Sequence, residues 1–173
     1  MSAHVGPAVV LAAGCGGSPA SPRPASGGGY LYWTYNDQIG RASLDGAGVD
    51  QRFITGASGA GMLAVSGGYL YWANTGYPRP GAADGGDTIG RGRLDGTGVN
   101  QQFITRAGFL TALAIDSRYI YWTSWGNARL ARAHHQRFGR GGAIGRARLD
   151  GTGVNRKFIS RGGDRGVAVN PRR

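Results

Sequence analysis

The sequence contains no glutamate, a single lysine, one cysteine and three histidines among its 173 residues. Two of the histidines, His134 and His135, are neighbours, and neighbouring side chains of an extended loop point apart. No cysteine or aspartate stands at metal-ligand spacing from this pair. The sequence also lacks a serine nucleophile elbow, a phosphate-binding loop and a Cys/His pair. We therefore expect no catalytic residue, no metal and no cofactor, and the composition favours a protein that is not an enzyme.

Long apolar runs and acidic residues are also scarce. No run approaches the length of a membrane-spanning helix. Nine aspartates face 20 basic residues, all but one of them arginine, which gives a net charge of +11. Such an excess can attract nucleic acid, anionic lipid head groups or acidic glycans. The alternative is that the protein is a structural scaffold and that its arginine content reflects a coding bias towards arginine, because most of the arginines recur at repeated positions.

What the chain has in plenty is glycine, 34 residues, and internal repetition. A string that begins with Ile-Gly-Arg and contains Leu-Asp-Gly occurs at Ile39–Thr55, Ile89–Thr105 and Ile144–Ser160. An aromatic string precedes each copy, at Tyr30–Trp33, Tyr69–Trp72 and Tyr119–Trp122. Repetition at this period indicates supersecondary units that cannot bury their apolar faces alone. Residues present in every unit are most simply structural, so function is sought where one unit differs from the others.

The middle unit predicts four short antiparallel strands, at Met62–Val65, Tyr69–Trp72, Ile89–Leu94 and Val99–Thr105. Ser-Gly-Gly and Asp-Gly supply the tight turns between them, because these residues tolerate positive φ. The third strand carries glycine on one face, which would allow another sheet to approach closely. The polar last strand suits an exposed edge. Short strands without helical periodicity describe a propeller blade.

Each unit resembles the YWTD repeat in the order of its parts: an apolar strand of the Gly-x-Ala-Val type, then Ile-Tyr-Trp, then Leu-Asp-Gly and a hairpin. This is the class B repeat of the low-density lipoprotein receptor, with copies in secreted bacterial proteins. The resemblance implies an all-β chain of three β-propeller blades, at about 30–61, 62–112 and 113–165. Residues 166–170 then open a fourth blade, before a basic tail at 171–173. The Asp that ends the family motif is replaced, by Tyr35, Asn74 and Ser124. A β-trefoil, also built from three four-stranded repeats, is the alternative fold.

The first 29 residues lie outside the repeats. A short apolar stretch, Val9–Ala13, ends in small residues before Cys15, and a Pro/Ser/Gly tether follows. This arrangement resembles a bacterial lipoprotein signal peptide, which implies that Cys15 is lipidated and that the protein is membrane-anchored or secreted outside the cytoplasm. Residues 1–5 contain no Lys or Arg, unlike most export signals. The alternative is an untargeted leader on a cytoplasmic protein.

The link between the second and third strands is short in the first unit and long in the others, at Asn74–Thr88 and Ser124–Ala143. Equivalent loops fall on one side of a propeller, so we expect them to share a rim. Arginines interleaved with aromatic rings can grip an anionic polymer or stack on a ring; a solvated insert is the alternative. The candidate ligand-binding residues are Tyr77, Arg79, Trp125, Arg129, Arg132, His134, His135, Arg137, Phe138 and Arg140.

These features favour a non-catalytic extracytoplasmic binding or scaffold protein, with a protein or an anionic polymer as partner. One alternative is a propeller enzyme, a hydrolase or one similar to streptogramin lyases, that uses the long-loop rim. Another is a fragment of a larger propeller. The first unit has Ser26–Gly29 where its first strand should be, and Gly166–Asn170 carries that strand type. A homodimer through exchange of this C-terminal strand is therefore expected, with a lipid anchor as the only membrane contact.

Overall fold

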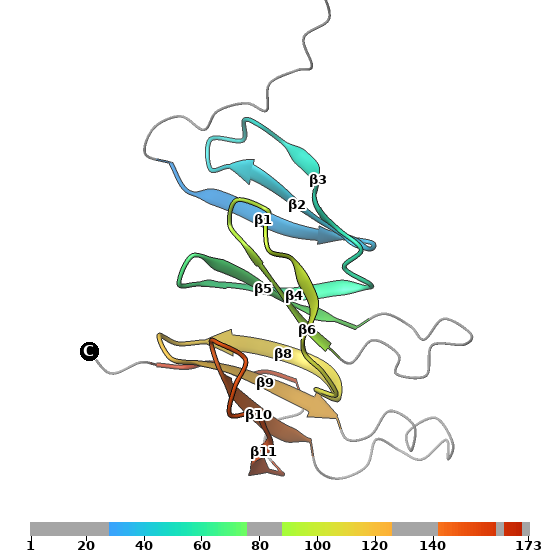
Figure 1. The fold of residues 1–173 in the computed structure, drawn as a ribbon, viewed down its shortest axis with the longest axis vertical. Coiled ribbons are helices and arrows are strands. Elements are labelled where there is room, and N and C mark those ends of the chain that lie inside the picture. The colour runs from blue at the N-terminus through green and yellow to red at the C-terminus, as the bar shows by residue number, and fades with distance from the viewer. Residues whose placement is uncertain (1–27, 76–87, 126–141, 162–164, 171–173) are drawn as a thin grey trace, which may run out of the picture.

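In the computed structural model, residues 28–75, 88–125, 142–161 and 165–170 are described. They form strands and turns without a helix, which confirms the all-β prediction (Figure 1). No helix in these ranges is long and apolar enough to cross a membrane.

The strands group into three antiparallel sheets, each built from consecutive strands. The first sheet contains β1 (Tyr30–Tyr35), β2 (Gln38–Ser43) and β3 (Asp50–Thr55). The second contains β4 (Ala60–Ser66), β5 (Tyr69–Asn74), β6 (Thr88–Arg93) and β7 (Asn100–Ile104). The third contains β8 (Phe109–Ile115), β9 (Tyr119–Trp125), β10 (Ala143–Arg148) and β11 (Asn155–Ser160). The second and third sheets begin before the predicted positions 62 and 113, because pairing extends to Ala60↔Asn74 and Phe109↔Trp125.

Each Leu-Asp-Gly string forms the hairpin between the last two strands of a sheet. In the second sheet, Gly96 has φ +88°, a conformation in which glycine carries no steric penalty. Asp95 Oδ1 accepts hydrogen bonds from Thr97 N at 2.8 Å and Thr97 Oγ1 at 2.7 Å. The side chain thus closes the turn on its own backbone, as Asp commonly does.

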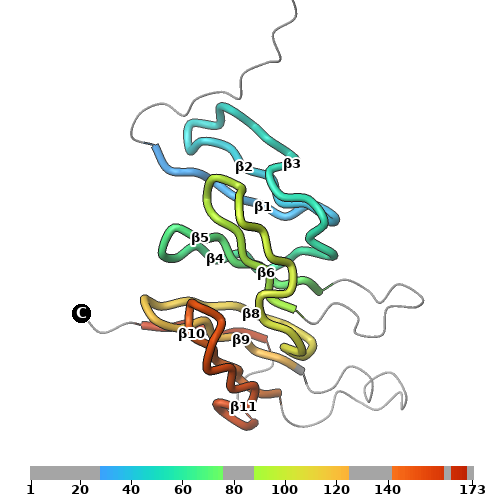
Figure 2. Tube along the Cα trace, viewed as in Figure 1, coloured from blue at the N-terminus to red at the C-terminus, as the bar shows by residue number. Residues whose placement is uncertain are grey.

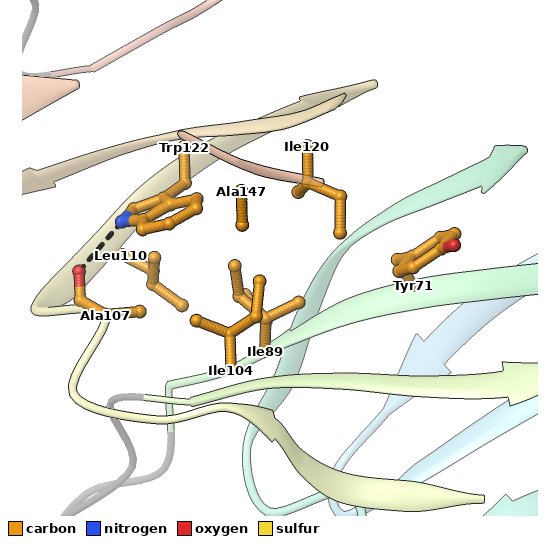
Figure 3. Packing of buried hydrophobic residues seen from close by; sticks show 9 residues of the cluster. Tyr71, Ile89, Ile104, Ala107, Leu110, Ile120, Trp122 and Ala147 are labelled. Atoms are coloured by element: carbon orange, nitrogen blue, oxygen red, sulfur yellow. Dashed lines mark hydrogen bonds between the residues drawn. The ribbon is translucent and has the colours of Figure 1, made fainter. Parts of the chain in front are cut away.

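The three sheets stack face to face in chain order (Figure 2). Between the first and second sheets lies a cluster of Ile39, Ile54, Ala57, Leu70 and Trp72. Between the second and third lies a larger cluster, shown in Figure 3, of Tyr71, Ala73, Ile89, Ile104, Ala107, Leu110, Ile120, Trp122 and Ala147. Each apolar layer is therefore shared by two adjacent sheets, as expected for repeats that cannot bury their faces alone.

A tryptophan lies flat across a glycine of the neighbouring strand in every sheet. Trp72 is paired with Gly90, and a Cβ placed on Gly90 would lie 2.3 Å from the indole. The room predicted on the glycine face is thus taken largely by the sheet's own tryptophan. Another sheet reaches the next glycine, Gly92, where the methyl of Ile54 lies 3.3 Å from the position of a Cβ.

Counted over the described residues, the first sheet has three strands and the other two have four. The missing strand is the one that would pair with the free edge of β1, as β4 pairs with β5. Gly166–Asn170, predicted to be a strand of this type, forms no strand in the structure. A strand requires a hydrogen-bonded neighbour, and this segment belongs to none of the three sheets, although Val167 and Val169 are partly buried.

Candidate functional site

Most of the predicted binding residues lie outside the described part of the chain. This applies to Tyr77, Arg79, Arg129, Arg132, His134, His135, Arg137, Phe138 and Arg140, and also to Cys15 and the basic tail at 171–173. Trp125 is the last residue of β9, with its backbone alone described. The structure does describe the strand ends from which both long loops depart.

The first long loop leaves the second sheet from a hydrogen-bonded base. Asn74 ends β5, is almost fully buried, and donates from Nδ2 to Thr88 Oγ1 at 2.9 Å and to the carbonyl of Gln101 at 2.8 Å. Thr88 Oγ1 also donates to that carbonyl at 2.9 Å. Asn74 Oδ1 is buried and has no hydrogen-bond partner among the described residues. The two ends of the loop are thereby clamped to each other and to β7.

The second long loop leaves the third sheet from an equivalent place. Ser124 in β9 pairs with Ala143 in β10, as Asn74 pairs with Thr88. Thr123 is fully buried and shares a 2.7 Å hydrogen bond with Thr111 of β8. Figure 1 shows that the ends of β5 and β9 lie on the same side of the stack. We call this side the loop-bearing edge; it consists of Asn74, Thr88, Trp125 and Ala143.

Three equivalent arginines, one in each sheet, stack on aromatic rings: Arg41 and Arg91 on faces covered by the next sheet, and Arg146 on the outer face of the third sheet. The guanidinium carbon of Arg91 lies 4.6 Å from the ring centroid of Tyr69 and 4.1 Å from that of Phe103. Arg41 and Arg146 are held in the same way by the matching rings of their own sheets. Guanidinium groups stacked on aromatic faces are attracted by the ring quadrupole.

Two of these arginines reach the next sheet. Arg41 Nη1 donates to the carbonyl of Leu94 at 3.1 Å, and Arg91 Nη1 donates to the carbonyl of Leu149 at 3.0 Å. Both acceptors belong to Leu-Asp-Gly turns. No such carbonyl accepts from Arg146 within the described residues, which form no further sheet beyond the third. The repeated arginine is therefore an inter-sheet clamp at two positions and is left without its carbonyl at the last.

The shifted pKa values belong to residues of the turns and of the apolar core. Hydrogen bonds from Thr97 lower the pKa of Asp95, and Thr152 does the same for the pKa of Asp150. Burial raises the pKa of the Tyr71 hydroxyl, which donates to the carbonyl of Leu149. These shifts come from contacts within the turns and between the sheets.

One acid has no counterpart in the second sheet. Partial burial opposes ionisation of Asp116, but the N–H groups of Arg118 and Tyr119 and the hydroxyl of Tyr121 outweigh it and lower its pKa. This carboxylate closes the turn between β8 and β9. Across the residues that the structure describes, no three His, Cys, Asp or Glu side chains gather as they would around a metal ion.

The two outer faces of the stack leave apolar side chains in solvent, as expected for an isolated arc of such units. The outer face of the third sheet exposes Phe158 and Ile159 beside Arg146, while the outer face of the first sheet exposes Leu31, Leu44 and Val49. The counterparts of Leu31 and Ile159 in other units include the buried Leu70, Ile54 and Ile104, so the residue type alone does not mark these positions as exposed. Their position at the two ends of the stack is what leaves them in solvent.

The chain was compared with known protein families and with characterised proteins. No family model matches it, and no curated protein matches it. The function is therefore argued from the geometry described above.

Proposed function

We propose that the chain is a non-catalytic binding or scaffold protein, built from YWTD-like propeller blades and displayed outside the cytoplasm. The observation that carries this proposal is the repeated contact between adjacent sheets. Arg41 meets the turn carbonyl of Leu94 as Arg91 meets that of Leu149, at nearly equal distances. Successive four-stranded sheets that pack through one repeated contact are the building principle of a propeller. A β-trefoil would instead bring strands of all three units into one barrel.

The loop-bearing edge is the proposed binding surface. Binding residues are commonly held on loops that a rigid scaffold positions. For the loop of the second sheet, the clamp of Asn74, Thr88 and Gln101 provides that rigidity, because a buried amide and a partly buried hydroxyl hold both of its ends. The loop that departs from the third sheet after Trp125 contains Arg129, Arg132, Arg137, Phe138 and Arg140, and the loop of the second sheet contains Arg79. This combination suits an anionic polymer, held by charge and by stacking.

Binding of a heparin oligosaccharide and of a single-stranded oligonucleotide, each titrated at several salt concentrations, tests this function. We expect affinity to fall steeply with salt, because each neutralised anionic group releases a counterion. Changing Arg129, Arg132, Arg137 and Arg140 to Gln should weaken binding of at least one probe more than tenfold.

A matched control removes four exposed arginines away from the loops, by changing Arg52, Arg93, Arg118 and Arg148 to Gln. Both variants lose the same net charge, so the control separates a localised site from general attraction to a basic protein. Equal losses in the two variants, or affinity that does not change with salt, would contradict the proposed site.

Display outside the cytoplasm is tested through Cys15. If this residue is lipidated, the protein should fractionate with membranes, and Cys15→Ser should release it or block its processing. A cytoplasmic product that still begins at Met1 would end this part of the proposal.

The enzyme alternative is tested through the titratable loop residues. Turnover in a substrate screen that disappears when His134, His135, Asp84 and Asp87 are changed to Ala would replace the binding function with a catalytic one.

A further inference from the structure

The contact between adjacent sheets places a phenylalanine against a turn glycine. A Cβ on Gly96 would lie 2.9 Å from the ring of Phe53, and a Cβ on Gly151 would lie 2.8 Å from the ring of Phe103. The phenylalanine and the turn glycine that occupy the same repeat positions without such a partner are Phe158, on the outer face of the third sheet, and Gly46, on the outer face of the first. Phe158 is 38% exposed, and nothing lies within 4 Å of a Cβ on Gly46.

A polar contact repeats at the same interface. Gln101 Nε2 donates to the carbonyl of Thr55 at 3.1 Å, across the first and second sheets. Arg156 donates from Nη2 to the carbonyl of Thr105 at 2.9 Å, across the second and third. The equivalent donor in the first sheet is Gln51, whose Oε1 already accepts from Trp33 Nε1 at 3.1 Å. The equivalent acceptor is the carbonyl of Ser160, in the third sheet.

The burial of equivalent apolar side chains also differs between inner and outer faces. Ile54 and Ile104 are each 2% exposed because the following sheet covers them, whereas Ile159 is 46% exposed. On the opposite side, Leu94 packs against the cluster that contains Ile54, whereas its counterpart Leu44 is 68% exposed. The outer face of the third sheet therefore ends with one half of the inter-sheet contact, and the outer face of the first sheet begins with the other half.

We propose that the outer face of the third sheet packs on the outer face of the first sheet of a second copy, and that two copies close head to tail into a ring of six sheets. In this contact Arg146 donates to the carbonyl of Leu44, Phe158 covers Gly46, and Gln51 donates to the carbonyl of Ser160. The proposal rests on the blade architecture of the proposed function. Propellers contain four to eight blades, so two copies with six fall in this range and three copies with nine fall outside it. A head-to-tail contact that closes gives a rotationally symmetric ring.

The free edge of β1 supplies a second, independent observation. In the second sheet, Leu63, Ala64 and Val65 pair with Trp72, Tyr71 and Leu70. The segment Val167-Ala168-Val169 has the same apolar pattern and lies outside every sheet of its own chain. By equivalence it pairs with β1 of the second copy, with Val167 opposite Trp33, Ala168 opposite Tyr32 and Val169 opposite Leu31. This exchange gives the first sheet its fourth strand.

Multi-angle light scattering of the full chain, over a range of concentrations, tests the proposal. We expect twice the 18.0 kDa chain mass. Leu44→Asp and Ile159→Asp each place a charge on one side of the contact and should give monomers. Val65→Asp is the matched control, because Val65 is similarly exposed but belongs to neither outer face, and this variant should remain a dimer.

Mixing Leu44→Asp with Ile159→Asp tests the head-to-tail arrangement directly. Such a pair retains one unaltered interface, so the mixture should regain the mass of a dimer that neither variant forms alone. If either variant fails to fold, as judged by its circular dichroism spectrum, Leu44→Ser and Ile159→Ser are mixed in the same way. A wild-type monomer, a mass that keeps growing with concentration, or a Leu44→Asp dimer would overturn the proposal.

The outcome is separable from that of the binding function. A folded monomer that still binds a polyanion in a salt-dependent way overturns the ring alone. A dimer that binds none of the probes supports the ring and overturns the binding function.

Discussion

The inner and outer faces of this stack are made from the same residues in opposite environments. Ile104 and Ile159 occupy one repeat position, yet the first is covered by the third sheet and the second is half exposed to solvent. Arg91 and Arg146 are held by the same pair of rings, yet only Arg91 reaches a turn carbonyl. The comparison teaches that a repeated residue stabilises this fold only where the next sheet completes its contact.

The largest effect is expected from shortening the isoleucine of the inner face. Ile104→Ala should lower the free energy of unfolding by about 3 kcal/mol, because it opens a cavity in the larger apolar cluster. Ile159→Ala should cost less than about 1 kcal/mol in a monomeric background such as Leu44→Asp. Urea denaturation of both variants measures the difference. Equal losses would mean that Ile159 is already covered within one copy.

The tryptophan–glycine contact gives the next comparison. Gly90→Ala should cost about 2 kcal/mol, since Trp72 is fully buried and its indole has nowhere to move. Gly40→Ala creates a similar overlap with Trp33, at 2.4 Å, but Trp33 is partly exposed and can turn outward. We expect a cost nearer to about 1 kcal/mol there. Thermal unfolding measures both, and a larger loss at Gly40 would contradict the comparison.

The arginine clamps should differ by a smaller amount. Arg91→Met removes a ring contact and a hydrogen bond to the carbonyl of Leu149, and we expect a loss of about 1 to 2 kcal/mol. Arg146→Met removes the equivalent ring contacts but no hydrogen bond to a turn carbonyl of a described residue, and should cost about 0.5 kcal/mol in a monomeric background. Chemical denaturation at neutral pH compares them. If the two losses are equal, the carbonyl contact adds no stability.

The smallest effect concerns pH. Asp95 and Asp150 have a pKa below the ordinary value of 3.8, because Thr97 and Thr152 donate to their carboxylates. A carboxylate whose pKa is lowered by folding stabilises the protein above the unfolded pKa, and this contribution is lost as pH falls through the folded value. Stability should therefore decline below about pH 4. Thr97→Val should flatten this decline; an unchanged profile would show that the turn contact contributes nothing.

Much of the fold was predictable from the sequence, because turn chemistry and apolar runs are local signals. The Asp-Gly and Ser-Gly-Gly turns delimit the strands, and the repetition gives three units. The residue that packs on the glycine face of β6 was not predictable. The alternation of side chains along a strand shows which face carries only glycine, but not whether Trp72 or another sheet fills the space above it. An arc of three units predicts that the outer faces of the first and third lie in solvent, but the residue types alone do not show which side chains are exposed. Ile54, Ile104 and Ile159 are the same residue type at the same position of the repeat. Only the order of their sheets in the stack determines which of them is exposed.

For the candidate site, the structure describes only the strand ends from which the two long loops depart. Unequal loop lengths in otherwise equal units point to the edge where Asn74 and Ser124 end their strand pairs, and the structure places both on one side. The buried hydrogen bonds of Asn74 depend on Gln101, which is distant in sequence and carries no motif of its own.

The pairing of consecutive strands within every sheet bears on how the chain is made. Ribosomes add about 5 to 20 residues per second, so each unit of roughly 50 residues emerges over several seconds. A hairpin forms in about 1 to 10 microseconds. Each sheet thus has time to form before its successor leaves the ribosome, because none of its strands waits for a later unit. What it lacks in that interval is the next layer over Ile54 or Ile104, so the nascent chain always carries one uncovered apolar face at its growing end.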